Sequence, residues 1–218
     1  MPRTTFELEL ENLQNDLLRM GTLVEQAIHD AVKSLAEKNL ELAEKVVRED
    51  DIADKLQMDI ENRCLALLAL QQPIARDLRT IGTAMKIVTD LERMADHAVD
   101  IAKVTIRIYD QPLIKPLIDI PRMAQITKTM VRQSLNAYVN RDVELSRQLA
   151  EADHEVDHLY GQVFRELLVY MMEDPRTINQ ATYLLFVAQY LERIADHTTN
   201  VGEWVVYMVT GERVDLNR

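Results

Sequence analysis

A heptapeptide occurs twice in this chain, and the duplication limits the folds that the sequence can adopt. Leu-Glu-Arg-Met-Ala-Asp-His at residues 91–97 returns as Leu-Glu-Arg-Ile-Ala-Asp-His at residues 191–197, with six of seven positions identical. A second pattern, Asp50-x-x-x-Asp54, returns further along as Asp153-x-x-x-Asp157. Because both patterns recur in the same order, the chain is predicted to hold two copies of one structural unit.

The spacing of apolar residues indicates that each unit is helical. From Leu10 to Ala31 the apolar positions lie three or four residues apart, as in a helix that packs along another helix. With only five glycines and six prolines in 218 residues, the chain has few places to turn. The sequence therefore predicts an all-α fold, with six long helices arranged as two tandem three-helix bundles.

Prolines mark where the units divide. Pro112, Pro116 and Pro121 fall within residues 110–121, a segment that no single helix can accommodate. We therefore expect a first bundle over residues 1–109, a linker over residues 110–121 and a second bundle over residues 122–218. Inside the bundles, helices are expected to end near Pro73 and near Asp174. The fourth, fifth and sixth helices are expected over residues 122–140, 142–174 and 175–210.

Composition argues against several classes of protein. The chain has 25 Lys and Arg against 36 Asp and Glu, a net charge of −11, which does not favour the basic face that nucleic acids require. Its single cysteine, Cys64, excludes an intrachain disulfide and any multi-cysteine metal site. The sequence has neither an apolar stretch long enough to span a bilayer nor a signal-like start. These features predict a cytoplasmic protein that meets membranes only through partners.

Acidic residues four positions apart are the most distinctive feature inside the repeats. Residues with this spacing share one face of a helix, so each pair places two repelling carboxylates side by side. All four pairs have the same position relative to the apolar seam of their helix. The pairs are Asp50 with Asp54, Glu92 with Asp96, Asp153 with Asp157, and Glu192 with Asp196.

The expected turns bring these pairs together. In an antiparallel hairpin, residues that are equally distant from the turn lie at the same height. Asp50 and Asp96 are equidistant from Pro73, and the pairs of the second half are equidistant from the Asp174–Pro175 junction. Each bundle is thus predicted to hold four carboxylates at one height. Such a set without sulfur ligands suits iron, manganese, magnesium or calcium. The alternative is a solvated acidic helix face, screened by nearby arginines.

Three histidines near the acidic motifs are candidates for further ligands. His97 and His197 follow the repeated motif directly, so they are either ligands, partners of ligands or ordinary histidines on the flank of a helix. Glu155-x-x-His158 matches half of the di-iron carboxylate signature, but a second copy of it is missing, which favours chance spacing. No catalytic residue is predicted.

The repeated motif, together with Pro-Ile-Ala-Arg-Asp-Leu-Arg at residues 73–79 and Glu-Asp-Pro-Arg at residues 173–176, resembles the PhoU family over nearly the whole chain. The resemblance implies a non-enzymatic, cytoplasmic regulator of phosphate uptake and phosphate-starvation signalling. Such a protein is an adaptor between the phosphate ABC transporter, through its ATPase subunit, and a phosphate-responsive sensor histidine kinase. It represses starvation genes when phosphate is abundant, and a homodimer is expected.

The resemblance also implies multinuclear metal clusters on the acidic motifs. Iron is favoured, with manganese, magnesium or zinc as alternatives. Asn200 stands where the first repeat has Asp100, which leaves open whether the two clusters hold equal numbers of ions. Two other functions stay open, a carboxylate-bridged metalloenzyme and a metal-free structural helical protein. The matching metal ligands are Asp50, Asp54, Glu92, Asp96, Asp153, Asp157, Glu192 and Asp196.

Overall fold

The computed structural model describes residues 3–71 and 74–217, and the helices in these ranges confirm the all-α prediction. Long helices alternate with short turns, and a single turn of 3₁₀ helix precedes the last long helix. The elements are α1 (Arg3–Glu37), α2 (Leu40–Gln71), α3 (Ala75–Ile108), α4 (Asp119–Asn140), α5 (Val143–Glu173), η1 (Pro175–Thr177) and α6 (Ile178–Thr210).

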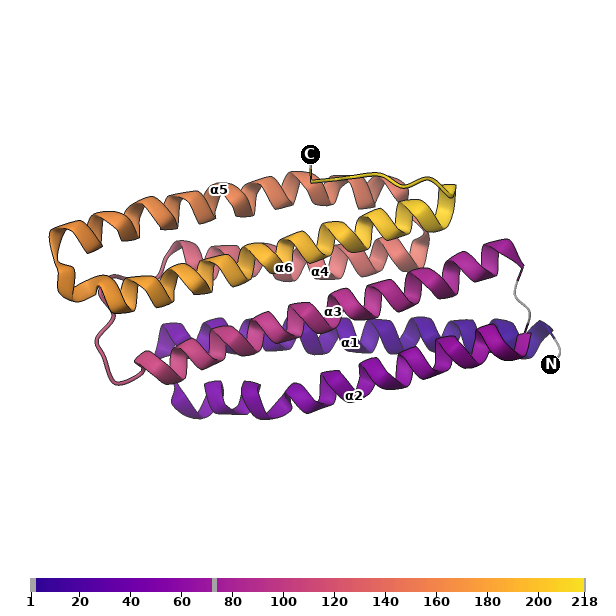
Figure 1. The fold of residues 1–218 in the computed structure, drawn as a ribbon, viewed down its shortest axis with the longest axis horizontal. Helices are drawn as coiled ribbons and strands as arrows, with labels where there is room; N and C mark the ends of the chain where they lie inside the picture. The colour runs from indigo at the N-terminus through magenta and orange to yellow at the C-terminus, as the bar shows by residue number, and fades with distance from the viewer. Residues whose placement is uncertain (1–2, 72–73, 218) are drawn as a thin grey trace.

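The two bundles lie side by side along their length (Figure 1). Helices α1, α2 and α3 pack together as the first bundle, and α4, α5 and α6 form the second. Between the bundles, α1 packs on α4 and α3 packs on α6. The buried apolar residues of both halves belong to one continuous core. The duplicated units therefore share a core instead of stacking end to end, a choice that the repeat alone leaves open.

The first turn of each bundle is built in the same way. Lys38 and Arg141 have positive φ angles of 55° and 54°, in the left-handed region that ends a helix sharply. The side chain of the next residue then caps the following helix. Asn39 Oδ1 accepts a hydrogen bond from Leu42 N at 3.0 Å, and Asp142 Oδ1 accepts one from Leu145 N at 2.9 Å. These tight turns hold neighbouring helices antiparallel.

The helix ends differ from the expected ones mainly at the linker. Helix α4 begins at Asp119 and includes Pro121, whereas the sequence placed its start at Arg122. A proline is tolerated there because the first turn of a helix needs no backbone N–H donor. Helix α5 ends at Glu173, close to the expected Asp174. The expected turn at Pro73 lies outside the described residues.

Close contact between the bundles depends on a glycine in α1. A Cβ atom added to Gly21 would overlap Leu135 Cδ1 on α4. Gly21→Val should therefore lower the free energy of unfolding by about 1–3 kcal/mol, since an overpacked core must shift side chains or backbone. Urea unfolding followed by circular dichroism measures the change. Gly82→Val is the matched control, because a Cβ at Gly82 meets nothing within 4 Å. Equal stability of the two variants would contradict the prediction.

Candidate metal centre

The first carboxylate cluster forms in the groove between α2 and α3, as the spacing predicts. Burial raises the pKa of Asp50, and the negative charges of Asp54 and Asp96 raise it further. The pKa of Glu92 is raised in the same way, by burial first and then by Asp96. The charges of Asp54 and Asp50 also raise the pKa of Glu92, so the structure brings the carboxylates of α2 and α3 within electrostatic reach of one another.

The second cluster lies between α5 and α6 and is more deeply buried. Asp153 is 3% exposed, and burial raises its pKa from 3.8 to about 7, with help from the charges of Asp157, Asp196 and Glu192. Burial is also the main cause of the raised pKa values of Glu192 and Asp196. In both halves, repulsion and desolvation thus disfavour four ionised carboxylates at one place.

Several carboxylate oxygens of these clusters are buried without a hydrogen-bond partner. Among the described residues, Asp50 Oδ1, Asp153 Oδ1 and Glu192 Oε2 are three of the four such side-chain atoms, and His97 Nδ1 is the fourth. A buried polar atom without a partner costs free energy, and most proteins avoid it. A bound cation would supply the missing partner and neutralise the repulsion, so the donor set fits a metal ion.

Arginines screen both clusters from the outside. Arg93 Nη1 lies 3.3 Å from Asp96 Oδ2, and the equivalent Arg193 Nη1 lies 3.6 Å from Asp196 Oδ2. Each guanidinium also approaches the glutamate of its motif, at 3.5 Å in the first half and 3.8 Å in the second. Arg193 Nε reaches the buried Glu192 Oε2 only at 3.8 Å, beyond hydrogen-bond distance, so this oxygen has a charged neighbour but no hydrogen bond.

A possible ligand that the sequence analysis did not consider is His154. Its ring nitrogen and the carboxylate oxygens of Asp153 and Asp157 all lie within 4.8 Å of one another. The first repeat has Asp51 at the equivalent position. The sequence holds a signal for it, because His154 lies three residues before Asp157, a spacing that places both side chains on one face of the helix. An imidazole donor suits iron or zinc better than magnesium, calcium or manganese at this cluster.

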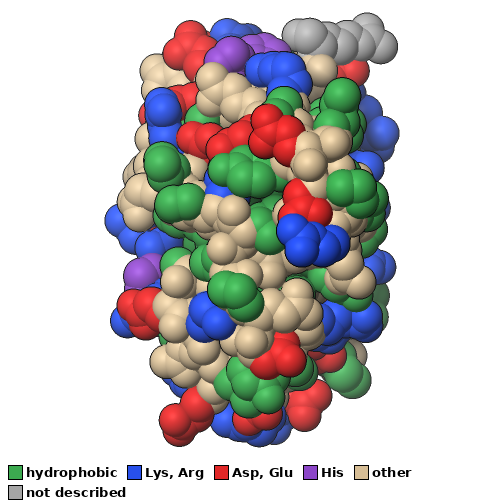
Figure 2. Space-filling view, turned by 90° about the vertical axis from the view of Figure 1, so that its left-hand side faces the viewer, with side chains coloured by type: hydrophobic (Ala, Val, Ile, Leu, Met, Phe, Trp, Pro, Cys, Tyr) green, Lys and Arg blue, Asp and Glu red, His purple; other side chains and the backbone are tan. Residues whose placement is uncertain are grey.

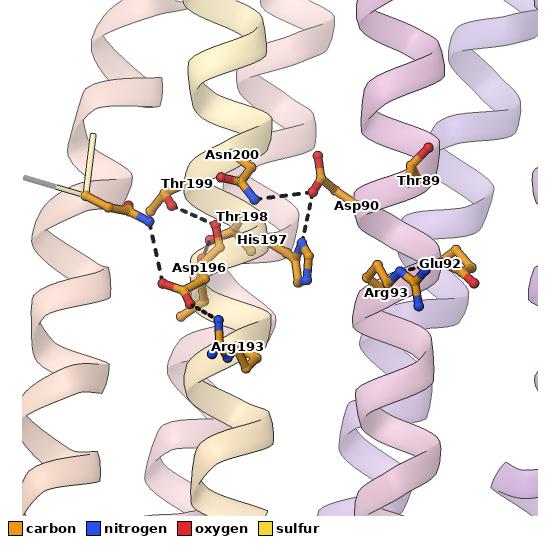
Figure 3. Close-up of polar contacts among 12 residues, drawn as sticks. Thr89, Asp90, Glu92, Arg93, Arg193, Asp196, His197, Thr198, Thr199 and Asn200 are labelled. Carbon is orange, nitrogen blue, oxygen red and sulfur yellow. Dashed lines mark hydrogen bonds and ion pairs between the residues drawn. The ribbon is translucent and has the colours of Figure 1, made fainter. Parts of the chain in front are cut away.

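The other histidines have different surroundings. His97 and His197 meet where α3 packs on α6, with ring centroids 5.9 Å apart. His197 Nδ1 lies 2.9 Å from Asp90 Oδ1 (Figure 3), and His97 stacks on Tyr190 at 5.6 Å. Burial and the neighbouring His197 lower the pKa of His97. These rings therefore join the two bundles at equivalent positions of the repeat.

The incomplete di-iron signature is part of an ordinary surface. Glu155 Oε1 accepts a hydrogen bond from Arg122 Nη2 of α4 at 2.7 Å, which directs this carboxylate toward the first helix of its bundle. His158 instead contacts Gln162 at 3.2 Å on its own helix. Their separate partners agree with chance spacing.

The remaining surface carries charges of both signs. On the end of the molecule shown in Figure 2, acidic and basic side chains alternate without forming a patch of one sign. Within the described residues, each helix is either too polar or too short in its apolar stretch to span a membrane.

Known proteins share this architecture. The PhoU domain model matches the chain twice, at residues 17–105 and 120–205, one match for each bundle. A crystal structure of PhoU from Pseudomonas aeruginosa superposes with a TM-score of 0.90 at 36% identity, covering 95% of this chain and all of the other. The phosphate transport system regulatory protein PhoU from Streptococcus pneumoniae gives a TM-score of 0.89 at 33% identity, covering 96% and 99% of the two chains.

Sequence relatives agree over the full length. A protein of Clostridium acetobutylicum called a phosphate-specific transport system accessory protein PhoU homolog is 46% identical, with both chains covered completely. A protein of Aquifex aeolicus with the same description is 45% identical, and the match covers 94% of this chain and 93% of the other. The two matches of the domain model and this full-length similarity show that the chain belongs to the PhoU family.

Proposed function

We propose that this protein regulates phosphate uptake and phosphate-starvation signalling as an adaptor. Its full-length similarity to proteins called phosphate-specific transport system accessory proteins carries this proposal. In the proposed role, the protein acts in the cytoplasm, as a homodimer. It binds the ATPase subunit of a phosphate ABC transporter and a phosphate-responsive sensor histidine kinase, and passes the state of the transporter to the kinase. Starvation genes are then repressed when phosphate is abundant.

The helical architecture supports an adaptor more than an enzyme. Helices α1, α5 and α6 are 35, 31 and 33 residues long, and they offer long continuous faces for partner domains. Glu155 and His158, which match half of a di-iron signature, bind separate partners on the surface. The acidic clusters instead fit a structural role, because a cation held there joins two helices of a hairpin.

We propose that metal ions bind both carboxylate clusters. The unpartnered oxygens of Asp50, Asp153 and Glu192 support this assignment, as does the raised pKa of each of these groups. A bound cation would neutralise the clustered charge and tie α2 to α3 and α5 to α6. Iron is favoured, with manganese, magnesium or zinc as alternatives, and His154 adds a nitrogen donor to the second cluster.

Gene deletion tests the adaptor proposal. In cells grown with abundant phosphate, loss of the gene should switch on a phosphate-starvation reporter, and the wild-type gene should restore repression. A gene carrying Asp50→Ala and Asp153→Ala should restore it poorly if the metal is needed for signalling. Glu41→Ala with Glu144→Ala is the matched control, since these acidic residues occupy equivalent first-turn positions in α2 and α5. Repression that persists in the deletion strain would refute the adaptor.

A further inference from the structure

The segment after α6, residues 211–217, folds back along the second bundle, and we call it the C-terminal tail (Figure 1). Gly211 ends the helix with a φ angle of 82°, a conformation that glycine adopts without strain. Its backbone N–H donates to Tyr207 O at 2.8 Å. This cap reverses the direction of the chain. The tail then runs back along α6, where Leu216 lies beside Gly202.

Side chains of α6 hold the tail in place. The Arg213 guanidinium lies over the ring of Trp204, 5.4 Å from its centroid. Leu216 donates its backbone N–H to Glu203 Oε1 at 2.9 Å. Its side chain packs so closely on the helix that a Cβ added to Gly202 would lie 3.3 Å from Leu216 Cδ1. The tail thus has a polar, an aromatic and an apolar anchor.

The end of the tail reaches the second carboxylate cluster. Asn217 Nδ2 donates to Asp196 Oδ1 at 3.5 Å, whereas Arg193 contacts the other oxygen, Asp196 Oδ2. The backbone N–H of Asn217 in turn donates to Asp215 Oδ1 at 3.2 Å, which orients the residue. Next to this contact, Asp153 is 3% exposed and keeps an oxygen without a partner, as a cation ligand would.

The first cluster is built differently. Lys103 occupies the position equivalent to Glu203, and its Nζ lies 3.1 Å from Asp100 Oδ1, near enough to Asp50 to act on its charge. After α3 the chain does not fold back. It crosses to the other bundle, where Lys115 forms an ion pair with Glu166. Within residues 3–71 and 74–217, the first cluster therefore has a lysine nearby where the second has an anchored tail.

We propose that the C-terminal tail covers the second metal centre and slows its exchange of metal, with Asn217 as the residue that positions Asp196. This inference rests on the proposed metal binding. A tail anchored at Leu216 restricts the approach of water and chelators on the side of Asp196, while Asp157 stays exposed. The Asn217 amide also restrains the rotamer of one ligand, and contacts to ligands commonly change metal affinity by about 10- to 100-fold. The first centre, beside Lys103, exchanges faster.

The rate at which Mn²⁺ is released to excess EDTA tests whether the C-terminal tail covers the second metal centre. Glu92→Ala with Asp96→Ala leaves only the second cluster intact, and Glu192→Ala with Asp196→Ala leaves only the first. In each background, the full chain is compared with a chain that ends at Gly211 and with the milder pair Leu216→Ala and Asn217→Ala. We expect both tail changes to speed release from the second cluster about tenfold and to leave release from the first unchanged.

The possible outcomes separate the cover from the metal assignment. If metal leaves the second cluster at the same rate with and without the tail, the tail does not cover this centre. That result would not contradict the proposed metal binding. Equal acceleration at both clusters also overturns the cover, because the tail would then stabilise the fold in general. If neither single-cluster protein binds Mn²⁺ or iron, the metal assignment itself fails, and the cover fails with it.

Discussion

Changing Glu92, Asp96, Glu192 and Asp196 together to alanine should abolish metal binding. The four substitutions remove the α3 and α6 halves of both clusters and leave a single aspartate pair on each of the facing helices. A pair on one helix supplies too few oxygens for the six or more ligands of a hard cation. Elemental analysis of protein purified without chelator should find stoichiometric metal in the wild type and none in the variant.

Metal binding should also raise the thermal stability of the folded protein. A ligand that binds only the folded chain at 100 times its Kd stabilises it by about 2.7 kcal/mol, so added Mn²⁺ or Fe²⁺ should raise the Tm of the wild type. The same ions should leave the Tm of the quadruple variant unchanged. Glu41→Ala with Glu144→Ala, which alters acidic residues outside the clusters, should respond like the wild type. A wild type that takes up no iron, manganese, magnesium or zinc on reconstitution would contradict the assignment.

Asp153→Asn should stabilise the metal-free protein at pH 8. The pKa of Asp153 rises from 3.8 to about 7 on folding, so between these pH values the folded chain keeps a proton that the unfolded chain has released. Stability contributed by this group is therefore complete below pH 4 and is lost as the pH rises to about 7. At pH 8 the ionised aspartate costs on the order of 4 kcal/mol, which the neutral amide avoids.

Urea unfolding in the presence of EDTA at pH 5 and pH 8 measures this effect. The wild type should lose more stability between the two pH values than Asp153→Asn does. Asp50→Asn is the matched control from the first repeat, and we expect a smaller gain there because Lys103 lowers the pKa of Asp50 while burial and its acidic neighbours raise it. Identical pH dependence in the wild type and Asp153→Asn would contradict the prediction.

Local patterns in the sequence predict most of the helical structure. The three- and four-residue spacing of apolar side chains leads to helices whose core residues, such as Leu13, Leu17 and Met20, are fully buried. Asn39 and Asp142 cap their helices because a side-chain oxygen can accept a backbone N–H three residues ahead. The start of α4 was missed, since Pro121 breaks a helix interior but fits a first turn.

The carboxylate clusters follow from the same local rules. A four-residue spacing puts two carboxylates on one helix face, and a tight turn midway between two pairs makes them face each other. The second cluster forms where this arithmetic places it, and burial, together with repulsion from neighbouring carboxylates, raises the pKa values of Asp153, Glu192 and Asp196. His154 follows neither the repeated heptapeptide nor the spacing of the di-iron signature, so only its three-residue spacing from Asp157 points to it.

The helices, the duplication and the facing acidic pairs are predictable from the sequence, because each depends on residues close in the chain or on one hairpin. How the two bundles meet depends instead on contacts between residues far apart in the chain. The packing of Gly21 against Leu135 and of His97 against His197 joins helices that the sequence separates by about 100 residues. Apolar periodicity defines which face of a helix is buried, but the fit of individual side chains selects the neighbour that covers it. The same fit seats Leu216 on Gly202 and brings Asn217 to Asp196.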